Sequence, residues 1–153
     1  MHVTPKKRFF VDATVQRLGK WLRYLGVDAP YLPCGQSVPS DAYLLTKKRW
    51  VKNPENVVVV PHDTIRDQLA WFMRFFSDVV DDDKIGTRCM KCNHILQSVS
   101  KEEVKDFVPD YVYQVHGRFR RCPNCGRIYW KGSHPQRMQS FLEKLYAPSE
   151  ETS

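Results

Sequence analysis

Residues 8–26 read RFFVDATVQRLGKWLRYLG, and within this stretch the side-chain pattern changes from that of a strand to that of a helix. The first six residues predict a short buried strand with Asp12 at its carboxyl end. Apolar side chains then recur at helical spacing, and Gly26 is a residue type that commonly ends a helix. A strand, an aspartate and a helix in this order are typical of an α/β unit, so an α/β fold is expected. The apolar side chains of this helix are Val15, Leu18, Leu22 and Leu25.

The rest of the first half fits the same fold. Residues 57–60 are four consecutive valines, which predict a strand buried in the centre of a parallel sheet. A helix is expected over residues 64–76, with Thr64 as its capping residue. Residues 29–40 contain prolines and a glycine and predict a loop, whereas residues 41–51 have no clear pattern.

Two C-x-x-C pairs are the strongest signal in the second half. Cys89 and Cys92 form one pair, and Cys122 and Cys125 form the other. Two residues between thiolates let both sulfurs of a tight turn face one cation, and two such turns complete a tetrahedral zinc site. Such a site has no open position for substrate, so we expect one zinc ion with a structural role. Two disulfides or a redox pair are the alternatives, and Cys34 is expected to be an ordinary thiol.

Nearby histidines are not needed as ligands, because four sulfurs already fill the coordination shell of zinc. We therefore expect His94 and His134 to be surface or packing residues. The elements expected in this half are a short capped helix from Ser100, an extended segment over residues 107–115, a strand over residues 128–130 and a final helix over residues 135–146.

The chain is basic. It has 153 residues, with 24 Lys and Arg against 17 Asp and Glu, and a net charge of +7. An excess of this size favours a polyanionic partner such as nucleic acid. Residues 111–142 contain six basic residues and no acidic one, and an acidic stretch at residues 78–83 separates them from the basic first part. This distribution predicts two parts, each with a basic surface.

Composition also excludes several classes of protein. No apolar run approaches the ~20 residues of a membrane helix, so no membrane partner is expected. The amino-terminal residues are basic and are followed by only a short apolar patch at Phe9–Val11, which does not fit a secretory signal. We therefore expect an intracellular protein, of the cytoplasm or the mitochondrion.

The motifs of the two halves occur in a specific order. The stretch at residues 10–26 is followed by RCMKCN at residues 88–93 and by CPNCGRIYWKGSH at residues 122–134. This series resembles the Mut-seven C-terminal RNase family, in which a PIN-like nuclease domain carries a zinc ribbon. The resemblance covers most of the chain, from about residue 8 to residue 142.

The resemblance implies a fold, a partner and a cofactor. The fold is a PIN-like three-layer α/β domain with a parallel sheet over residues 1–84, then a zinc ribbon with a C-terminal helix over residues 85–147 and a polar tail over residues 148–153. The partner is RNA rather than a small molecule. If the chain is active, the cofactor is Mg²⁺ or Mn²⁺, because PIN-type chemistry needs several carboxylate oxygens that converge on a hard divalent cation.

The acidic motifs of the family are only partly matched. Asp12 matches the aspartate after the first strand. Residues 45–49 are the best local match to the family's L-T-R-D motif, and they place Lys48 where the carboxylate belongs. The region of the middle acid is shortened, and Asp41 is its remnant. An ammonium group at this position opposes metal binding but suits phosphate, which indicates a nuclease scaffold that binds RNA without cleaving it.

A second alignment takes residues 58–63 as the strand and its motif, which makes Asp63 the missing acid. It keeps Asp12, Asp41 and Asp63 together as the ligands of an active metal-dependent ribonuclease. It also requires an insertion after Asp41 and a large deletion after Asp63, whereas the first alignment runs without a gap into the following helix. Under the first alignment, which we favour, Asp63 caps a helix and Asp12 accepts hydrogen bonds from the start of the helix that follows it.

Three groups of residues are the candidate RNA contacts. They are Lys6, Lys7 and Arg8; Lys47, Lys48 and Arg49; and Arg118, Arg120, Arg121, Arg127, Lys131 and His134. Tyr129 and Trp130 are either stacking platforms for bases or part of the ribbon core. We expect a non-catalytic RNA-binding subunit of a ribonucleoprotein such as a ribosome, with protein neighbours. The alternatives are the active ribonuclease and a zinc-ribbon protein–protein adaptor.

Overall fold

The computed structural model describes residues 8–33, 35–49, 56–131, 140, 143 and 144. The chain forms two compact units, one up to Ile95 and one from Leu96 onward. The division follows the first C-x-x-C pair, whereas the sequence predicts a domain boundary after residue 84. The first cysteine pair therefore belongs to the same unit as the parallel sheet.

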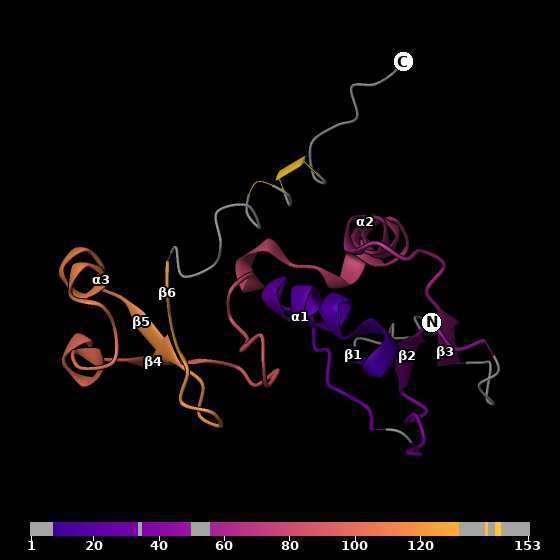
Figure 1. The fold of residues 1–153 in the computed structure, drawn as a ribbon, viewed down its shortest axis with the longest axis horizontal. Helices are drawn as coiled ribbons and strands as arrows, with labels where there is room; N and C mark the ends of the chain where they lie inside the picture. The colour runs from indigo at the N-terminus through magenta and orange to yellow at the C-terminus, as the bar shows by residue number, and fades with distance from the viewer. Residues whose placement is uncertain (1–7, 34, 50–55, 132–139, 141–142, 145–153) are drawn as a thin grey trace, which may run out of the picture. The chain divides into compact units, whose positions relative to one another are not determined.

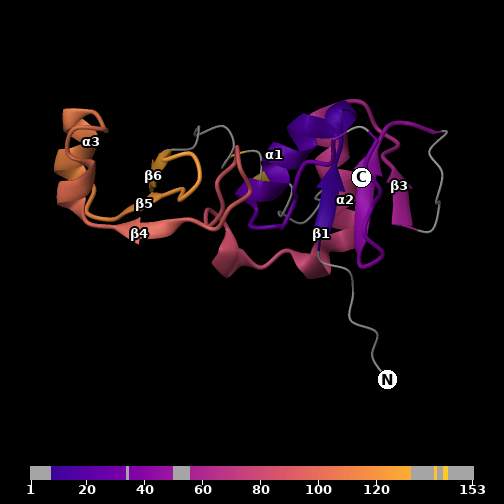
Figure 2. The same ribbon diagram turned by 90° about the horizontal axis from the view of Figure 1, so that it is seen from below.

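The N-terminal unit contains a parallel sheet of three strands in the order β1–β2–β3 (Figures 1 and 2). The strands are β1 (Arg8–Val11), β2 (Ala42–Thr46) and β3 (Val57–Val59). Val11 lies opposite Leu45, and Leu45 lies opposite Val58. The strand β2, which falls in the segment without a clear pattern, is thus the central one, and its last three residues are buried.

The prediction that residues 57–60 form a central strand is wrong in its position. The segment does form a strand, but β3 lies at one edge of the three-stranded sheet. Val57 and Val58 are half-buried and Val59 is exposed. Consecutive valines favour any extended segment that packs on one face, so the run alone does not separate an edge strand from a central one.

Helices follow the strands where the sequence predicts them. The short 3-10 helix η1 (Ala13–Val15) leads into α1 (Gln16–Tyr24), and α2 (Ile65–Phe76) follows β3. The Thr64 side chain accepts a hydrogen bond from the Asp67 N–H at 3.2 Å, as its predicted capping role requires. Two further 3-10 turns end this part, η3 (Ser77–Val79) and η4 (Asp82–Lys84).

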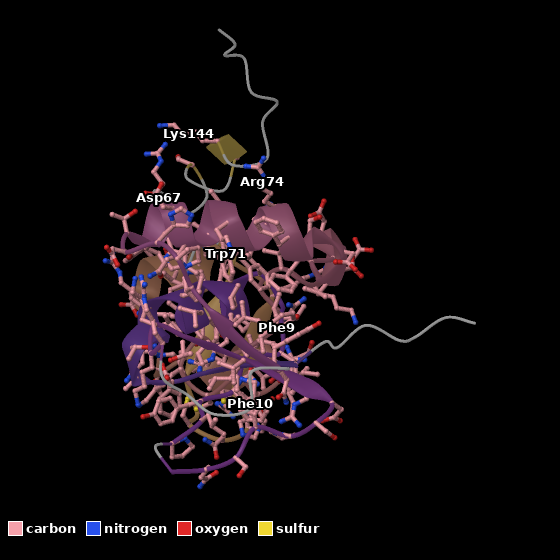
Figure 3. The ribbon with its side chains drawn as sticks, turned by 90° about the vertical axis from the view of Figure 1, so that its right-hand side faces the viewer. Phe9, Phe10, Asp67, Trp71, Arg74 and Lys144 are labelled. Carbon is pink, nitrogen blue, oxygen red and sulfur yellow. The ribbon has the colours of Figure 1, made fainter. Side chains whose placement is uncertain are left out.

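Successive side chains of β1 pack on opposite faces of the sheet. Phe9 meets the rings of Phe72 and Phe76 on α2, with ring centroids 5.1 Å apart in both pairs. Phe10 packs on the other face, in a cluster with Leu32 and Leu44. Figure 3 shows Phe9 on the side of α2 and Phe10 away from it. This alternation follows from the two-residue period of a strand, and it buries both faces.

The connection between α1 and β2 runs along the free edge of β1. The Phe9 N–H donates to the Asp28 carbonyl, and the Val11 N–H donates to the Pro30 carbonyl, both at 2.9 Å. The segment enters this position from Gly26, which has a φ of 85° and ends the helical region as predicted. The backbone of β1 is therefore hydrogen-bonded on both sides.

The C-terminal unit is a small antiparallel sheet with helical turns beside it. Its strands β4 (Gln97–Val99), β5 (Phe119–Arg121) and β6 (Ile128–Trp130) pair in that order. The 3-10 helix η5 (Lys101–Val104) begins with the predicted capping box of Ser100 and Glu103. A hydrophobic cluster of the C-terminal unit buries Val104, Val108, Val112 and Phe119.

The prediction of an extended segment over residues 107–115 is wrong, because α3 spans Asp110–Val115. Pro109 precedes the helix and Asp110 lies in its first turn, where both residue types are favoured. Val108 and Val112 are spaced as neighbours on a helical face and reach the core together. The final helix predicted over residues 135–146 lies outside the described residues, apart from residues 140, 143 and 144, which are helical.

Within the described part of the chain, no helix has the length and apolar character needed to cross a membrane.

Replacing Gly26 by alanine is expected to destabilise the N-terminal unit by about 2–4 kcal/mol. The added Cβ would lie 2.4 Å from the Lys84 carbonyl oxygen, and the φ of +85° is unfavourable for alanine. The control is Gly86→Ala, where φ is +80° but no atom lies within 4 Å of the new Cβ. This control is expected to cost about 1 kcal/mol, from the backbone conformation alone. Urea denaturation measures both values, and equal losses would contradict the steric overlap at Gly26.

Candidate functional site

The first C-x-x-C pair forms a tight turn at the end of the N-terminal unit. The Cys89 N–H donates to the His94 carbonyl, and the Asn93 N–H donates to the Cys89 carbonyl, both at 2.8 Å. The Cys92 N–H lies 3.4 Å from the sulfur of Cys89. Asn93 has a φ of 71°, a left-handed conformation that asparagine tolerates better than most residues.

The second pair repeats this geometry in the C-terminal unit. The Cys122 N–H donates to the Arg127 carbonyl, and the Gly126 N–H donates to the Cys122 carbonyl, both at 2.9 Å. The Cys125 N–H lies 3.5 Å from the sulfur of Cys122. Gly126 has a φ of 79°. The turn is the loop that joins β5 to β6.

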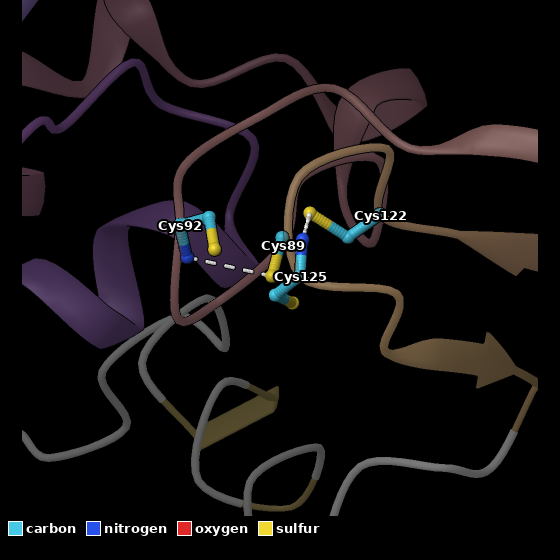
Figure 4. A group of neighbouring side chains, drawn as sticks. All are labelled: Cys89, Cys92, Cys122 and Cys125. Atoms are coloured by element: carbon cyan, nitrogen blue, oxygen red, sulfur yellow. Dashed lines mark hydrogen bonds between the residues drawn. The ribbon is translucent and has the colours of Figure 1, made fainter.

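The sulfur atoms of these four cysteines lie within 4.8 Å of one another (Figure 4). A tetrahedral zinc ion, with Zn–S distances of about 2.3 Å, separates its sulfur ligands by about 3.8 Å, so the group fits zinc after a small contraction. In the part of the chain that the structure describes, these cysteines are the one group of three or more ligand side chains found close enough to hold a metal ion. The two pairs therefore form a single candidate metal site, as the sequence predicts, and the exposed His94 is not part of it.

Side chains of the N-terminal unit hold the first turn in place. Arg23 reaches from α1 and donates to the Met90 carbonyl at 2.9 Å. The amide group of Asn93 accepts from the Ala29 N–H at 2.9 Å and donates to the Asp28 carboxylate at 2.8 Å. Arg88 donates to the Asn93 carbonyl at 2.9 Å. One half of the metal site is thus bonded to the α/β unit.

Asp12 lies at the carboxyl end of β1 and is buried, with 8 % of its surface exposed. One carboxylate oxygen accepts hydrogen bonds from the Thr14 N–H at 2.9 Å and from the Thr14 hydroxyl at 2.5 Å. The other accepts from the Thr46 hydroxyl at 2.5 Å. The predicted role of Asp12 at the start of the following helix is confirmed, because it caps η1.

Asp63 lies on the segment between β3 and α2 and forms an ion pair with Lys47. Its side chain is 87 % exposed. The Lys47 ammonium group also donates to the His62 carbonyl at 3.0 Å. The hydrogen bond from Lys47, together with its charge, holds the pKa of the Asp63 carboxyl below its usual value. Asp63 does not cap α2, since Thr64 has that role.

The structure places Asp41 far from Asp12. Asp41 precedes the first residue of β2, whereas Thr46, which binds Asp12, is its last residue. Because β1 and β2 are parallel and in register, Asp41 lies at the amino ends of the strands and Asp12 lies at their carboxyl ends. At about 3.3 Å per residue, the strand puts roughly 16 Å between Asp41 and Thr46.

Comparison with family models finds one match, the Mut7-C RNAse domain, over residues 7–142. The chain belongs to the Mut7-C RNAse domain family. The match covers most of the chain and includes both cysteine pairs, so the resemblance seen in the motifs is confirmed. No curated protein and no solved structure matches the chain.

In this Mut7-C chain the segment that resembles the L-T-R-D motif lies at the carboxyl end of the central strand. Leu45 and Thr46 end β2, and Lys47 and Lys48 follow. The Lys47 N–H donates to the Thr14 hydroxyl at 2.9 Å, and the Lys48 N–H donates to the Thr46 hydroxyl at 3.0 Å. These bonds connect the turn after β2 to the two hydroxyls that bind Asp12.

The predicted RNA contacts differ in their surroundings. Some have acidic partners: Arg8 pairs with Asp28 at 3.5 Å, Lys47 pairs with Asp63, and Arg121 lies 4.0 Å from Glu103. Lys48 is half-buried. The exposed members are Arg49, Arg118, Arg120, Arg127 and Lys131. Lys6, Lys7 and His134 lie outside the described residues.

Of the two aromatic side chains considered for base stacking, Tyr129 is buried with 7 % exposed. Trp130 is half-buried and packs against the core cluster, with its ring centroid 6.4 Å from that of Phe119. Trp130 therefore contributes to the core of the C-terminal unit, one of the two roles predicted for it, and the burial of Tyr129 leaves little of its ring accessible to a base.

Sequence reasoning assigned no role to Thr14, Thr46, Arg23 or the Asn93 side chain. The two threonines are small polar residues in otherwise regular elements, so their pairing with Asp12 has no sequence signal beyond the L-T motif. Arg23 had a weak signal, because it lies beside Leu22 in a helix that is otherwise apolar on its buried side. An arginine in that position needs buried hydrogen-bond acceptors.

Replacing Cys89 or Cys122 by serine is expected to abolish stoichiometric zinc binding, because each change leaves only three thiolates. The unaltered chain is expected to carry one zinc ion per molecule, measured by elemental analysis of freshly purified protein. Cys34→Ser is the matched control, because Cys34 belongs to neither pair, and it is expected to retain the zinc. Zinc-free unaltered protein, or full zinc in Cys122→Ser, would reject the site.

Proposed function

We propose that this member of the Mut7-C RNAse domain family binds RNA without cleaving it. In this proposal the chain is a stable subunit of a ribonucleoprotein such as a ribosome and has protein neighbours there. The family match gives an RNase-related origin. The acidic residues around the parallel sheet support a loss of catalysis, and the basic hairpin of the C-terminal unit supports retained RNA binding.

The strongest support for lost catalysis is the environment of Asp63. A catalytic Mg²⁺ or Mn²⁺ needs several carboxylate oxygens around one point. Asp63 instead meets the ammonium group of Lys47, which already supplies a positive charge to it. A cation that approached Asp63 would have to displace Lys47 or accept repulsion from it.

The remaining acids do not compensate for this pairing. Both oxygens of Asp12 accept hydrogen bonds from threonine hydroxyls, so a metal would have to displace Thr14 or Thr46. Asp41 lies at the opposite end of the strands, before the first residue of β2. A single satisfied carboxylate holds a divalent cation poorly, and this favours a binding role over the alternative of an active ribonuclease with Asp12, Asp41 and Asp63.

Retained RNA binding is supported by the hairpin of β5 and β6. Arg118, Arg120, Arg127 and Lys131 are exposed on or beside this hairpin. Residues 111–131 contain no acidic side chain that would oppose them. Because Tyr129 is buried and Trp130 packs in the core, phosphate contacts rather than base stacking are proposed as the main source of affinity.

The metal in this proposal is one zinc ion with a structural role. The four cysteines would hold it, and a closed four-thiolate site leaves no position for a substrate. Among the described residues, the hydrophobic cluster around Val104 and Phe119 is small, so metal binding is proposed as a main source of stability for the C-terminal unit.

Binding to a labelled single-stranded RNA is expected to weaken steeply as salt is raised. Each lost phosphate contact reduces the slope of log K against log salt by about 0.7. Arg118→Gln and Arg127→Gln are each expected to give this reduction. Lys105→Gln is the control, because Lys105 lies among Glu102, Glu103 and Asp106, and it should leave the slope unchanged. Weak affinity with little salt dependence would favour the protein–protein adaptor instead.

Cleavage is tested with the same RNA in the presence of Mn²⁺. We expect no turnover by the unaltered chain, because the carboxylates of its described residues do not gather around a common point. Asp12→Asn is the control for contaminating nucleases. Turnover that disappears in Asp12→Asn would overturn the non-catalytic proposal and establish the active ribonuclease.

A further inference from the structure

Arg23 is a buried cation on the last turn of α1, with 9 % of its surface exposed. Its guanidinium group binds three backbone carbonyls. Nε donates to Ala29 at 2.8 Å, and Nη1 donates to Met90 at 2.9 Å and to Lys91 at 3.4 Å. Met90 and Lys91 are the two residues between Cys89 and Cys92, so Arg23 binds the turn that carries two of the metal ligands.

The bond to Lys91 bears directly on the geometry of the sulfurs. No peptide bond in the described chain is cis. In a trans peptide the carbonyl and the following N–H point in opposite directions. When the Lys91 carbonyl points to Arg23, the Cys92 N–H points away from it, and this N–H lies 3.4 Å from the Cys89 sulfur. Arg23 thereby fixes the peptide that donates to a ligand sulfur.

Segment 28–29 is held by the same turn from a second side. Arg23 binds the carbonyl of Ala29, while Asn93 binds its N–H at 2.9 Å. Asn93 directly follows Cys92 and also donates to Asp28. The turn is therefore fixed on either side of its ligands, by Arg23 between them and by Asn93 after them.

Charge adds to this geometry. Four thiolates and a divalent zinc ion sum to a net negative charge, which is unfavourable where Cys89 is fully buried. Burial lowers the pKa of Arg23, and the charges of Cys89 and Cys92 act in the opposite direction. The guanidinium group is bonded to the two residues between these cysteines, Met90 and Lys91. A cation in this position offsets part of the charge of the thiolates.

We propose that Arg23 is a positioning residue of the zinc site, which sets the first cysteine pair in its ligand geometry and offsets the charge of its sulfurs. It does not touch the metal and acts through the backbone of residues 90–92. This role rests on the zinc site of the proposed function. In this role, α1 of the N-terminal unit supports the zinc site. The position of Arg23 in the sequence, far from the cysteines, gives no sign of such a role.

The test is the rate at which the intact, zinc-loaded chain releases zinc to an excess of a colorimetric chelator. Arg23→Met is expected to release zinc about 10- to 100-fold faster, the usual effect of removing a residue that orients metal ligands. Arg23→Lys should recover only part of the loss, because an ammonium group keeps the charge but lacks the planar fork that joins Ala29 to Met90. Arg17→Met, an exposed arginine on the same helix, should release zinc like the unaltered chain.

A second control separates positioning from general stability. Leu69→Ala opens a cavity under α2, at a fully buried residue, and does not alter the turn at residues 89–93. If Leu69→Ala accelerates zinc release as much as Arg23→Met, or if Arg23→Met releases zinc like the unaltered chain, the positioning role is wrong. Should Arg23→Met fail to fold by circular dichroism, the comparison of Arg23→Lys with Leu69→Ala decides the question. Unaltered protein without zinc would instead contradict the zinc site itself.

Discussion

The convergence of four sulfur atoms within 4.8 Å is the constraint on which the C-terminal half of this chain depends. In the described part of this half, strands of three residues and a small hydrophobic cluster contribute little stability by themselves. The cysteines come from two turns with the same hydrogen bonds, each closed by a residue in the left-handed conformation. The first of these turns is also bonded to α1, a helix far from it in the sequence, through Arg23.

A second constraint acts at the carboxyl edge of the parallel sheet. In a parallel sheet the ends of neighbouring strands meet at one edge, and functional groups of α/β proteins collect there. In this chain the edge holds Asp12, Thr14 and Thr46 in one network, with Lys47 bonded to it through its N–H. The ammonium group of Lys47 then meets Asp63. The chain belongs to the Mut7-C family, and the polar groups at the carboxyl ends of its strands are paired with one another by hydrogen bonds and an ion pair. This pairing is the basis of the proposal that the chain binds RNA without cleaving it.

Much of the local structure could be predicted because it depends on side-chain periodicity. The strand that ends before Asp12, the helix from Thr64 and the capping box at Ser100 all follow from short patterns. The failures have a common cause. The valines of β3 favour a strand anywhere in a sheet, and the residues of α3 alternate enough to suggest an extended segment. In both cases the packing partners, β2 for the first and Val104 and Phe119 for the second, decide the outcome.

The sequence by itself determined the membership of the family, the four cysteines of the candidate metal site and the basic character of the hairpin, because residue type and short spacing are sufficient for each. The tertiary structure alone decided the surroundings of the three candidate acids. Asp41 is separated from Asp12 because the two residues precede and follow parallel strands in register, and Asp63 faces Lys47 because β3 lies beside β2. The tertiary structure also decided the partners of Arg23, because the carbonyls of residues 90 and 91 are 67 and 68 residues away from it in the sequence. Strand direction and long-range packing bring such groups together, and no local pattern encodes either one.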